Sequence, residues 1–205
     1  MSEGNHATVA VTGVTGALGS RIASRLADHG VPQLLVGRSP DRMPELPGAQ
    51  RRGPAAYADA DASDMRKALK GASTLILVSG HRTGRRLEEH ATAVEAAIAV
   101  GVDRVLYVSL VSASPTATYL NARDQWLTEQ FLAGAGIRHT VLRSGFYTST
   151  PAALANEEFV VNGPGSTGRA AFVTHEDIAD VITAVALDEG PRSEHDGATL
   201  EITGP

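Results

Sequence analysis

Three glycines stand near the start of the chain at regular spacing, at Gly13, Gly16 and Gly19. A short apolar run precedes them, and a segment with helical apolar spacing follows. In such a turn the first glycine permits a tight bend, the second lets the backbone approach a phosphate, and the third allows close helix packing. The N–H groups of the first helical turn then face the anion. The turn therefore predicts a dinucleotide pyrophosphate site formed by Gly13, Thr15, Gly16, Ala17, Leu18 and Gly19.

The second apolar run, residues 33–37, is followed by a basic residue where many dinucleotide-binding proteins carry an acidic one. An acidic side chain at this point binds the ribose 2′-hydroxyl of NAD, whereas Arg38 suits the 2′-phosphate of NADP. Ser39 can add a hydrogen bond to the same phosphate. The sequence favours NADP(H) as cofactor and leaves NAD(H) open, since arginines are also common on solvated surfaces.

Polar and aromatic residues follow the later apolar runs, at the strand ends that face a ligand crevice in parallel sheets. We expect Val78, Ser79, Gly80 and Ser109 to lie beside the cofactor. We expect His81, Phe146 and Tyr147 to lie on the substrate side, with Tyr147 a weak candidate for a catalytic group. Ordinary strand-to-loop termination explains any one of these residues equally well.

Composition excludes several other chemistries. The 205 residues contain no cysteine, which removes disulfides, thiolate catalysis and sulfur-ligated metals. The histidines show no metal-binding helical spacing, and no nucleophile elbow or phosphate-binding loop with Gly-Lys-Ser/Thr is present, so no metal site is expected. A net charge of -5 without a basic block argues against nucleic acid. No long apolar run or signal-type start appears, so we expect no membrane partner and a cytoplasmic location.

Apolar runs that alternate with helical patterns predict the elements that position these residues. The fold class expected is α/β, a Rossmann-type doubly wound parallel sheet with a small C-terminal substrate region. Strands are predicted at 7–11, 33–37, weakly at 55–57, and at 74–78, 105–108, 139–142 and 199–202. Helices are predicted after the glycine turn, at 64–69, around 87–98 with an apolar face of Leu87, Ala91, Val94 and Ile98, and at about 124–133.

The pattern changes after Arg143, where proline and glycine become frequent. We therefore divide the chain into an NAD(P)-binding core, 1–147, and a C-terminal substrate-side region, 148–205, integrated with that core. A capping-box pattern, Thr174 with Asp177, begins one more helix. Its predicted apolar face is Ile178, Val181, Ile182 and Val185, and Gly190-Pro191 is predicted to end it.

Several segments together resemble the NmrA-like group of atypical short-chain dehydrogenase/reductases, and most of all its NAD(P)H:quinone oxidoreductase type 2 branch. The resemblance covers nearly the whole chain. The glycine motif is shared by all such dehydrogenases, and the later segments narrow the resemblance to the NmrA-like group. The segments that carry it are 11–19, 77–80, 89–90, 96–102, 107–110, 128–129, 132, 136–137, 140–147, 177–179 and 202–205.

The resemblance implies an NADPH-dependent reductase that passes hydride directly from the nicotinamide to a quinone or another conjugated carbonyl, without flavin or metal. Some members of the group do no chemistry and instead sense NADP(H) and regulate a partner protein. This remains the alternative function, and a polyketide-tailoring enzyme with a larger substrate is a third reading. A homodimer is also left open.

Three departures from the family pattern bear on the site. Gln125 stands where the quinone reductases tend to carry histidine and typical short-chain dehydrogenases carry lysine. It is the other weak catalytic candidate and an expected substrate contact, because an amide hydrogen-bonds but does not shuttle protons. Tyr119 and Arg123 are out of register with the family's Tyr/Lys pair. Asp59 is expected on the adenine side, where the usual Gly-Asp is lacking. The chain also ends earlier than its relatives, so the substrate region is expected to be shorter.

Overall fold

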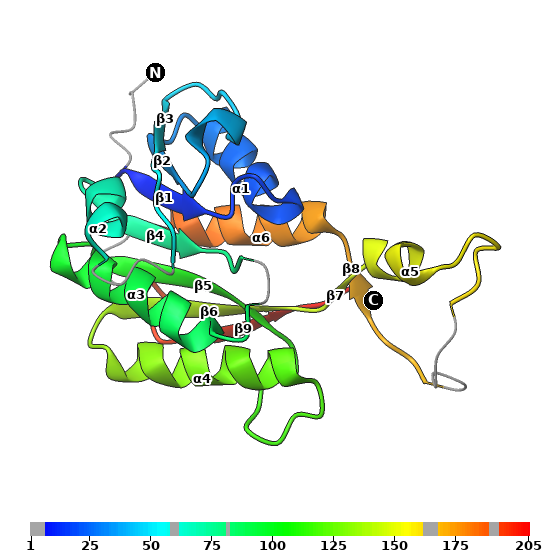
Figure 1. Ribbon diagram of the computed structural model, residues 1–205. Helices are drawn as coiled ribbons and strands as arrows, with labels where there is room; N and C mark the ends of the chain where they lie inside the picture. The colour runs from blue at the N-terminus through cyan, green and yellow to red at the C-terminus, as the bar shows by residue number, and fades with distance from the viewer. Residues whose placement is uncertain (1–6, 58–61, 81–82, 162–167, 189–192) are drawn as a thin grey trace.

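The computed structural model describes residues 7–57, 62–80, 83–161, 168–188 and 193–205. Within these ranges seven parallel strands form one sheet in the order β3-β2-β1-β4-β5-β6-β9, which confirms the predicted Rossmann-type fold (Figure 1). The strands are β1 Val9–Thr12, β2 Gln33–Val36, β3 Ala49–Arg52, β4 Thr74–Leu77, β5 Arg104–Leu110, β6 Arg138–Ser144 and β9 Thr199–Ile202. A separate short pair joins β7 Phe146–Tyr147 and β8 Phe172–Val173.

Helices cover both faces of the sheet. The helices α1 (Ala17–Asp28) and α6 (His175–Leu187) pack on one face, and their apolar residues share a core with one side of the strands. The other face carries α2 (Ser63–Leu69), α3 (Arg86–Ala99) and α4 (Leu120–Gly134) with a second core (Figure 1). Because the central strands are buried on both faces, they read as continuous apolar runs in the sequence.

The strand order reverses between β1 and β4. The strands β2 and β3 lie on one side of β1, and the chain then crosses to place β4 on the other side. Ligands bind at such a switch point, in the crevice beyond the carboxyl ends of the strands. The loops after β1, β2, β4, β5 and β6 therefore meet at one edge, where the predicted site residues lie.

The third strand is β3 at Ala49–Arg52, so the prediction of a strand at 55–57 is wrong. This strand lies at the edge of the sheet and pairs only with β2 among the described residues. An edge strand needs few buried side chains, and Gln50, Arg51 and Arg52 are all polar, so no apolar run marks it. Ala55 is buried without being in a strand, and this misled the sequence interpretation.

The predicted apolar faces of two helices need correction. In α3, Ile98 is 43% exposed, and the buried stripe contains small residues such as Ala93 and Ala97 beside His90. Close packing on the sheet selects small side chains here, so apolar size was a poor guide. In α6, Val181 is 36% exposed while the other predicted face residues are buried.

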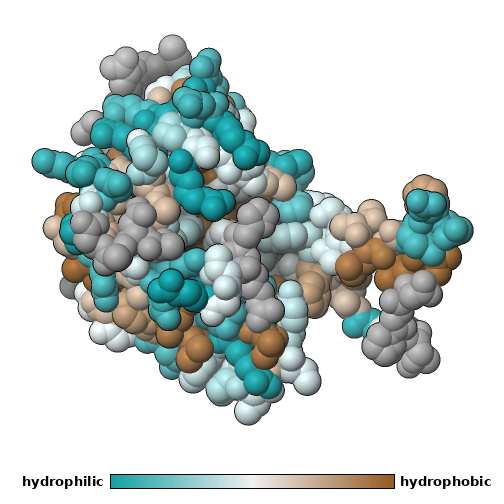
Figure 2. All heavy atoms as spheres, in the orientation of Figure 1, coloured by the Kyte–Doolittle hydropathy of each residue, from teal (hydrophilic) through white to brown (hydrophobic). Residues whose placement is uncertain are grey.

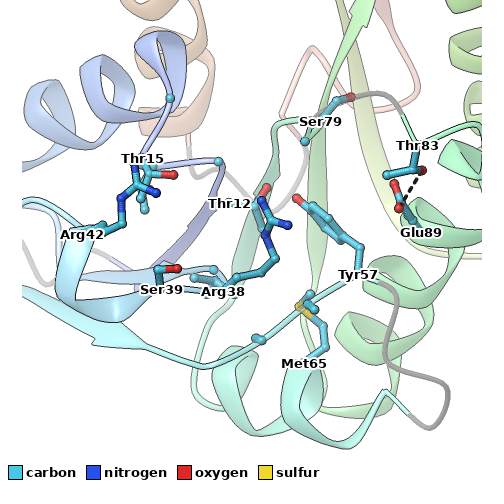
Figure 3. Close-up of a pocket in the computed structure, with 18 residues that line it drawn as sticks. Thr12, Thr15, Arg38, Ser39, Arg42, Tyr57, Met65, Ser79, Thr83 and Glu89 are labelled. Carbon is cyan, nitrogen blue, oxygen red and sulfur yellow. Dashed lines mark hydrogen bonds between the residues drawn. The ribbon is translucent and has the colours of Figure 1, made fainter.

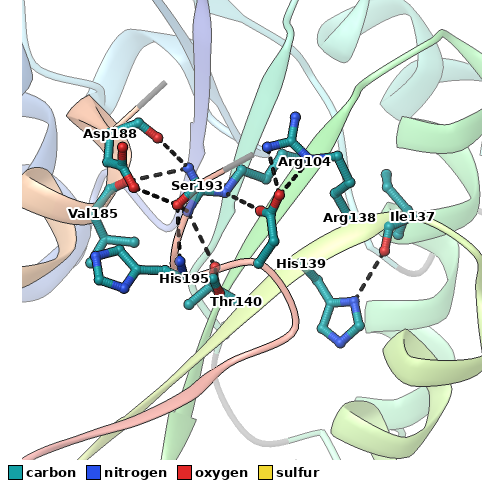
Figure 4. Close-up of polar contacts among 10 residues, drawn as sticks. Arg104, Ile137, Arg138, His139, Thr140, Val185, Asp188, Ser193 and His195 are labelled. Atoms are coloured by element: carbon teal, nitrogen blue, oxygen red, sulfur yellow. Dashed lines mark hydrogen bonds and ion pairs between the residues drawn. The ribbon is translucent and has the colours of Figure 1, made fainter. Parts of the chain in front are cut away.

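The two ends of α6 are fixed in different ways. Thr174 accepts a hydrogen bond from the Asp177 backbone N–H at 3.0 Å, which confirms the predicted cap. The helix ends at Leu187, before the predicted Gly190-Pro191 stop, which lies outside the described residues. The buried guanidinium of Arg104 donates to the carbonyl oxygens of Val185 and Asp188, at 3.3 and 2.9 Å (Figure 4).

Arg104 also holds the segment that leads into β9. It donates to the Thr140 and Ser193 hydroxyls, both at 3.2 Å, and its Nε lies 3.5 Å from the Asp196 carboxylate (Figure 4). One buried cation thus joins β5, β6, the carboxyl end of α6 and the loop before β9. Cations are favourable at a helix carboxyl end because they complement its dipole.

We expect Arg104→Ala to lower the free energy of unfolding by about 2–4 kcal/mol, because it leaves the carbonyls of Val185 and Asp188 without their donor, while Asp196 keeps its pair with Arg138. Urea denaturation followed by circular dichroism measures this. The matched control is Arg51→Ala, which removes a pair between a partly exposed arginine and the exposed Glu45, and should cost less than about 1 kcal/mol. Equal losses for the two variants would contradict the role given to Arg104.

The segment after β7 projects from the body of the molecule (Figure 1). It contains α5 (Ser149–Leu154) and carries exposed apolar side chains, with Leu154 66% and Phe159 91% exposed (Figure 2). Among the residues that the structure describes, none of the helices is both long and apolar enough to cross a bilayer.

Candidate dinucleotide and substrate site

The glycine turn has the conformation that phosphate binding requires. Gly13 adopts a positive φ of 68°, and its carbonyl accepts the Gly16 N–H at 2.9 Å. A Cβ on Gly19 would lie 2.3 Å from the Gly13 carbonyl oxygen, so only glycine fits where α1 meets the turn. Gly16 caps α1 without a side-chain hydrogen bond, and no acidic residue stands in the first helical turn. The exposed end of α1 is thus open to an anion.

A cavity of about 470 Å³ begins at this turn (Figure 3). Its lining includes Gly13, Thr15, Gly16, Arg38, Ser39, Ser79 and Gly80 from the predicted cofactor set. Ala17, Leu18 and Gly19 lie just behind it as the first residues of α1. The site fits a dinucleotide, because the N–H groups of the glycine turn, the guanidinium of Arg38 and the hydroxyl of Ser39 share one cleft.

The sequence reasoning missed several residues of this first cavity. Arg42, in the turn Pro40–Arg42, extends toward Thr15, and Arg38 extends into the cavity from the end of β2 (Figure 3). Tyr57 forms part of the lining, and its hydroxyl donates to the Val78 carbonyl at 3.0 Å. The spacing of Arg42, four residues after Arg38, was the available signal. The other unpredicted lining residues include Met65, Thr83 and Glu89.

A second cavity, of about 230 Å³, adjoins the ends of β4, β5 and β6. It brings together the predicted residues Val78, Ser79, Ser109, Gln125, Phe146 and Tyr147. Ser79 lines both cavities, so they adjoin at this residue. Its buried Oγ has no hydrogen-bond partner among the described residues, as expected of a group that meets a ligand. Asp59 and His81 lie outside the described residues.

The polar groups of the second cavity differ in what they can offer a ligand. The Ser109 hydroxyl donates to Glu129 at 2.6 Å, and Arg143 holds that carboxylate through two hydrogen bonds of 2.9 and 2.7 Å. Ser109 is thus left as an acceptor. Burial raises the pKa of Tyr147, which keeps its hydroxyl protonated as a donor. The Gln125 amide is also buried and lines the cavity.

The Tyr119 and Arg123 side chains make different contacts. Tyr119 lines the second cavity but is 52% exposed. Arg123 donates instead to the backbone carbonyl of Ala117, in the loop before α4.

A buried histidine lies behind both cavities. The His90 ring packs edge-on against Tyr57 and Tyr107, with centroid distances of 6.1 and 5.3 Å, and its Nδ1 lies 3.0 Å from Thr128 Oγ1. Burial, with a smaller contribution from the charge of Arg86, lowers the pKa of His90 to about 3. His90 is therefore neutral in the folded protein at ordinary pH, and its ring packs against Tyr57 and Tyr107.

This lowered pKa gives a pH-dependent stability with a definite sign. The unfolded chain binds a proton at His90 below a pH of about 6.5, whereas the folded chain does so only near pH 3. Stability contributed by neutral His90 is complete above pH 6.5 and falls by about 1.4 kcal/mol per pH unit below it. We expect His90→Asn to show a shallower loss of unfolding free energy between pH 6 and pH 4. Parallel pH profiles for the two proteins, measured by urea denaturation, would refute this.

A parallel sheet with a glycine turn at its switch point and a cleft lined by arginines defines a Rossmann-type dinucleotide-binding protein. The family model described as NAD(P)H-binding matches residues 13–189, and the chain belongs to this family. The membership confirms the fold class and the resemblance predicted from the sequence.

Named relatives share most of this chain's length. Quinone oxidoreductase 2 of Escherichia coli is 32% identical over 204 residues, which cover 96% of this chain and 68% of that protein. A (4-alkanoyl-5-oxo-2,5-dihydrofuran-3-yl)methyl phosphate reductase of Streptomyces griseus is 30% identical, with coverage of 96% and 68%. The crystal structure of an NADPH-dependent quinone oxidoreductase from Escherichia coli complexed with NADPH superposes with a TM-score of 0.79, at 31% identity, covering 96% of this chain and 69% of that one.

Proposed function

We propose that the protein is an NADPH-dependent oxidoreductase that transfers hydride directly to a quinone or another conjugated carbonyl. The observation that carries this proposal is the shared wall at Ser79 between a cleft suited to a dinucleotide and a second cavity lined by neutral hydrogen-bonding groups. That second cavity offers an amide and a phenol, and neither is a strong acid. An acceptor whose reduced form is a stabilised oxyanion suits such a site.

The relatives support this acceptor class. One is named for quinone reduction, and the name of the other describes an oxo-dihydrofuran that carries an alkanoyl group. The chemistry common to the two names is a carbonyl within an unsaturated or conjugated ring system. A related structure contains NADPH. Arg38 and Arg42, which follow β2 and line the first cavity, are consistent with the same cofactor here.

We assign cofactor binding to the residues of the first cavity and acceptor binding to those of the second. The first turn of α1 would hold the pyrophosphate, and Arg38, Ser39 and Arg42 line the part of the first cavity that would hold the 2′-phosphate. Bound NADPH supplies the hydride. Gln125 and Tyr147 hold the acceptor in near-attack geometry and donate hydrogen bonds to its oxygen. The phenolate that quinone reduction forms takes its proton from water, so no lysine or histidine acid is needed.

This proposal predicts a selective enzyme. With saturating NADPH, a panel of quinones should cause loss of NADPH absorbance, while isolated ketones should not, because their alkoxides are far more basic. Gly16→Val, which places a branched side chain against the phosphate site, is the binding-deficient control. Measurable NADPH binding without oxidation across the quinone panel would overturn the proposal.

The alternative function, a non-catalytic NADP(H) sensor, is favoured by one observation. Gln125 lines the second cavity where the resemblance implies a proton-transferring group, and an amide does not titrate near neutral pH. A sensor should bind NADPH and NADP+ with different affinities and should not oxidise NADPH with any acceptor. Calorimetric titration with both cofactor forms, together with the quinone panel, separates the two functions.

A further inference from the structure

We propose that Tyr107 is a positioning residue that fixes the amide of Gln125, so that its NH₂ group donates a hydrogen bond to the carbonyl oxygen of the acceptor. This inference rests on the proposed function, since it assigns a carbonyl to the second cavity. Tyr107 lies in the middle of β5 and does not line that cavity. We assign its effect on a ligand to Gln125 on α4, because its hydroxyl donates to that side chain.

The contact between the two side chains is direct and enclosed. The Tyr107 hydroxyl donates a hydrogen bond to Gln125 Oε1. Tyr107 is fully buried, and Gln125 is 6% exposed. The Tyr107 ring is held edge-on by His90 at an interplanar angle of 73°, and Thr128 anchors that histidine. The hydroxyl has little freedom to move away from the amide.

The hydrogen bond from the Tyr107 hydroxyl to Oε1 indicates which way the Gln125 amide faces. Burial raises the pKa of Tyr107, so its oxygen stays protonated and acts as a donor. The amide oxygen is the group that can accept that proton. A reversed amide would donate to the phenol oxygen and leave the phenol proton to another neighbour such as Thr128 or Ser79, whereas the observed contact runs from the hydroxyl to Oε1.

With its oxygen turned to Tyr107, Gln125 has its nitrogen left for the cavity. Among the described residues the Gln125 nitrogen has no hydrogen-bond partner. It is absent from the set of buried polar atoms without partners, so it is not fully enclosed. Since Gln125 lines the second cavity, the nitrogen reaches its surface. A donor fixed in advance stabilises the oxygen on which charge develops, without reorganisation during the reaction.

The test is a double-mutant cycle on ligand binding. Calorimetry measures the Kd of duroquinone for the protein saturated with NADP+, a complex in which no hydride is available. Tyr107→Phe and Gln125→Ala should each weaken binding by about 3- to 10-fold. The double variant should bind no more weakly than Gln125→Ala alone, because Tyr107 acts only through Gln125. Gln125→Glu retains an acceptor for Tyr107 but loses the donor, and should also weaken binding.

Val105→Ala is the matched control for loss of stability. Val105 lies two residues before Tyr107 on the same strand and in the same core, but it does not line either cavity. It should lower the urea midpoint and leave the duroquinone Kd unchanged. Both single variants and the control should retain NADP+ affinity.

Three results would overturn the inference: no duroquinone binding by the wild-type chain, an unchanged Kd in Tyr107→Phe, or a full Tyr107→Phe effect in the Gln125→Ala background. Failure of the proposed function is read separately, from the NADPH absorbance. The expected binding cycle in a protein that does not oxidise NADPH supports the positioning role and removes the enzyme. Quinone turnover without the expected binding cycle supports the proposed function and removes the positioning role of Tyr107.

Discussion

Replacing Gly19 with alanine should weaken NADPH binding by about 100-fold or more, because phosphate-binding N–H groups are displaced. A Cβ at this position would lie 2.3 and 2.5 Å from the carbonyl oxygen and carbon of Gly13 and 2.9 Å from the Val14 nitrogen. All three are backbone atoms, so either the glycine turn or α1 must move. Such overpacking should also lower the free energy of unfolding by about 1–3 kcal/mol.

Gly134→Ala is the matched control for this substitution. Gly134 lies at the carboxyl end of α4, and a Cβ there meets no atom within 4 Å. Alanine favours helix more than glycine does, so this variant should keep its NADPH affinity and gain slightly in stability. NADPH fluorescence titration measures both proteins. A Gly19→Ala protein that binds NADPH as tightly as Gly134→Ala would refute the geometry assigned to the turn.

The second large effect is expected at the 2′-phosphate site. Arg38→Ala should weaken NADPH binding by about 10- to 100-fold and leave NADH binding nearly unchanged, because a charge-assisted hydrogen bond to the 2′-phosphate is lost. Arg42→Ala should act in the same direction, since Arg42 lines the same cavity. Removing both arginines should abolish the preference for NADPH.

Arg51→Ala serves as the control for loss of a positive charge. Arg51 lies on β3, pairs with Glu45, and is not among the lining residues of the first cavity. Parallel titrations with NADPH and NADH give the ratio of the two affinities for each variant. If Arg38→Ala lowers both affinities equally, Arg38 supports the cleft in another way and does not read the 2′-phosphate.

Much of the fold could be predicted because its strongest signals are local. The glycine turn depends on residues within one short segment, and its φ at Gly13 and its packing at Gly19 are as expected. The central strands are buried on both faces and show it as apolar runs. The cap at Thr174 also follows from two residues three positions apart.

The features that were missed depend on contacts between distant parts of the chain. The edge strand β3 is defined by its pairing with β2 and has no apolar pattern of its own. Arg104 holds groups from β6, α6 and the loop before β9, and nothing near it in the sequence indicates this. Sequence reasoning singled out Gln125 but could not show that Tyr107 orients it.

The central claim is that hydride passes from NADPH to an acceptor held in the second cavity. A single-turnover experiment tests it most directly: protein in excess over bound NADPH is mixed anaerobically with excess duroquinone, and NADPH loss and hydroquinone formation are followed together. The account predicts one hydroquinone formed for each NADPH consumed, and a much slower reaction for Gln125→Ala at equal cofactor occupancy. A protein that binds both NADPH and duroquinone while the NADPH absorbance stays constant would contradict it.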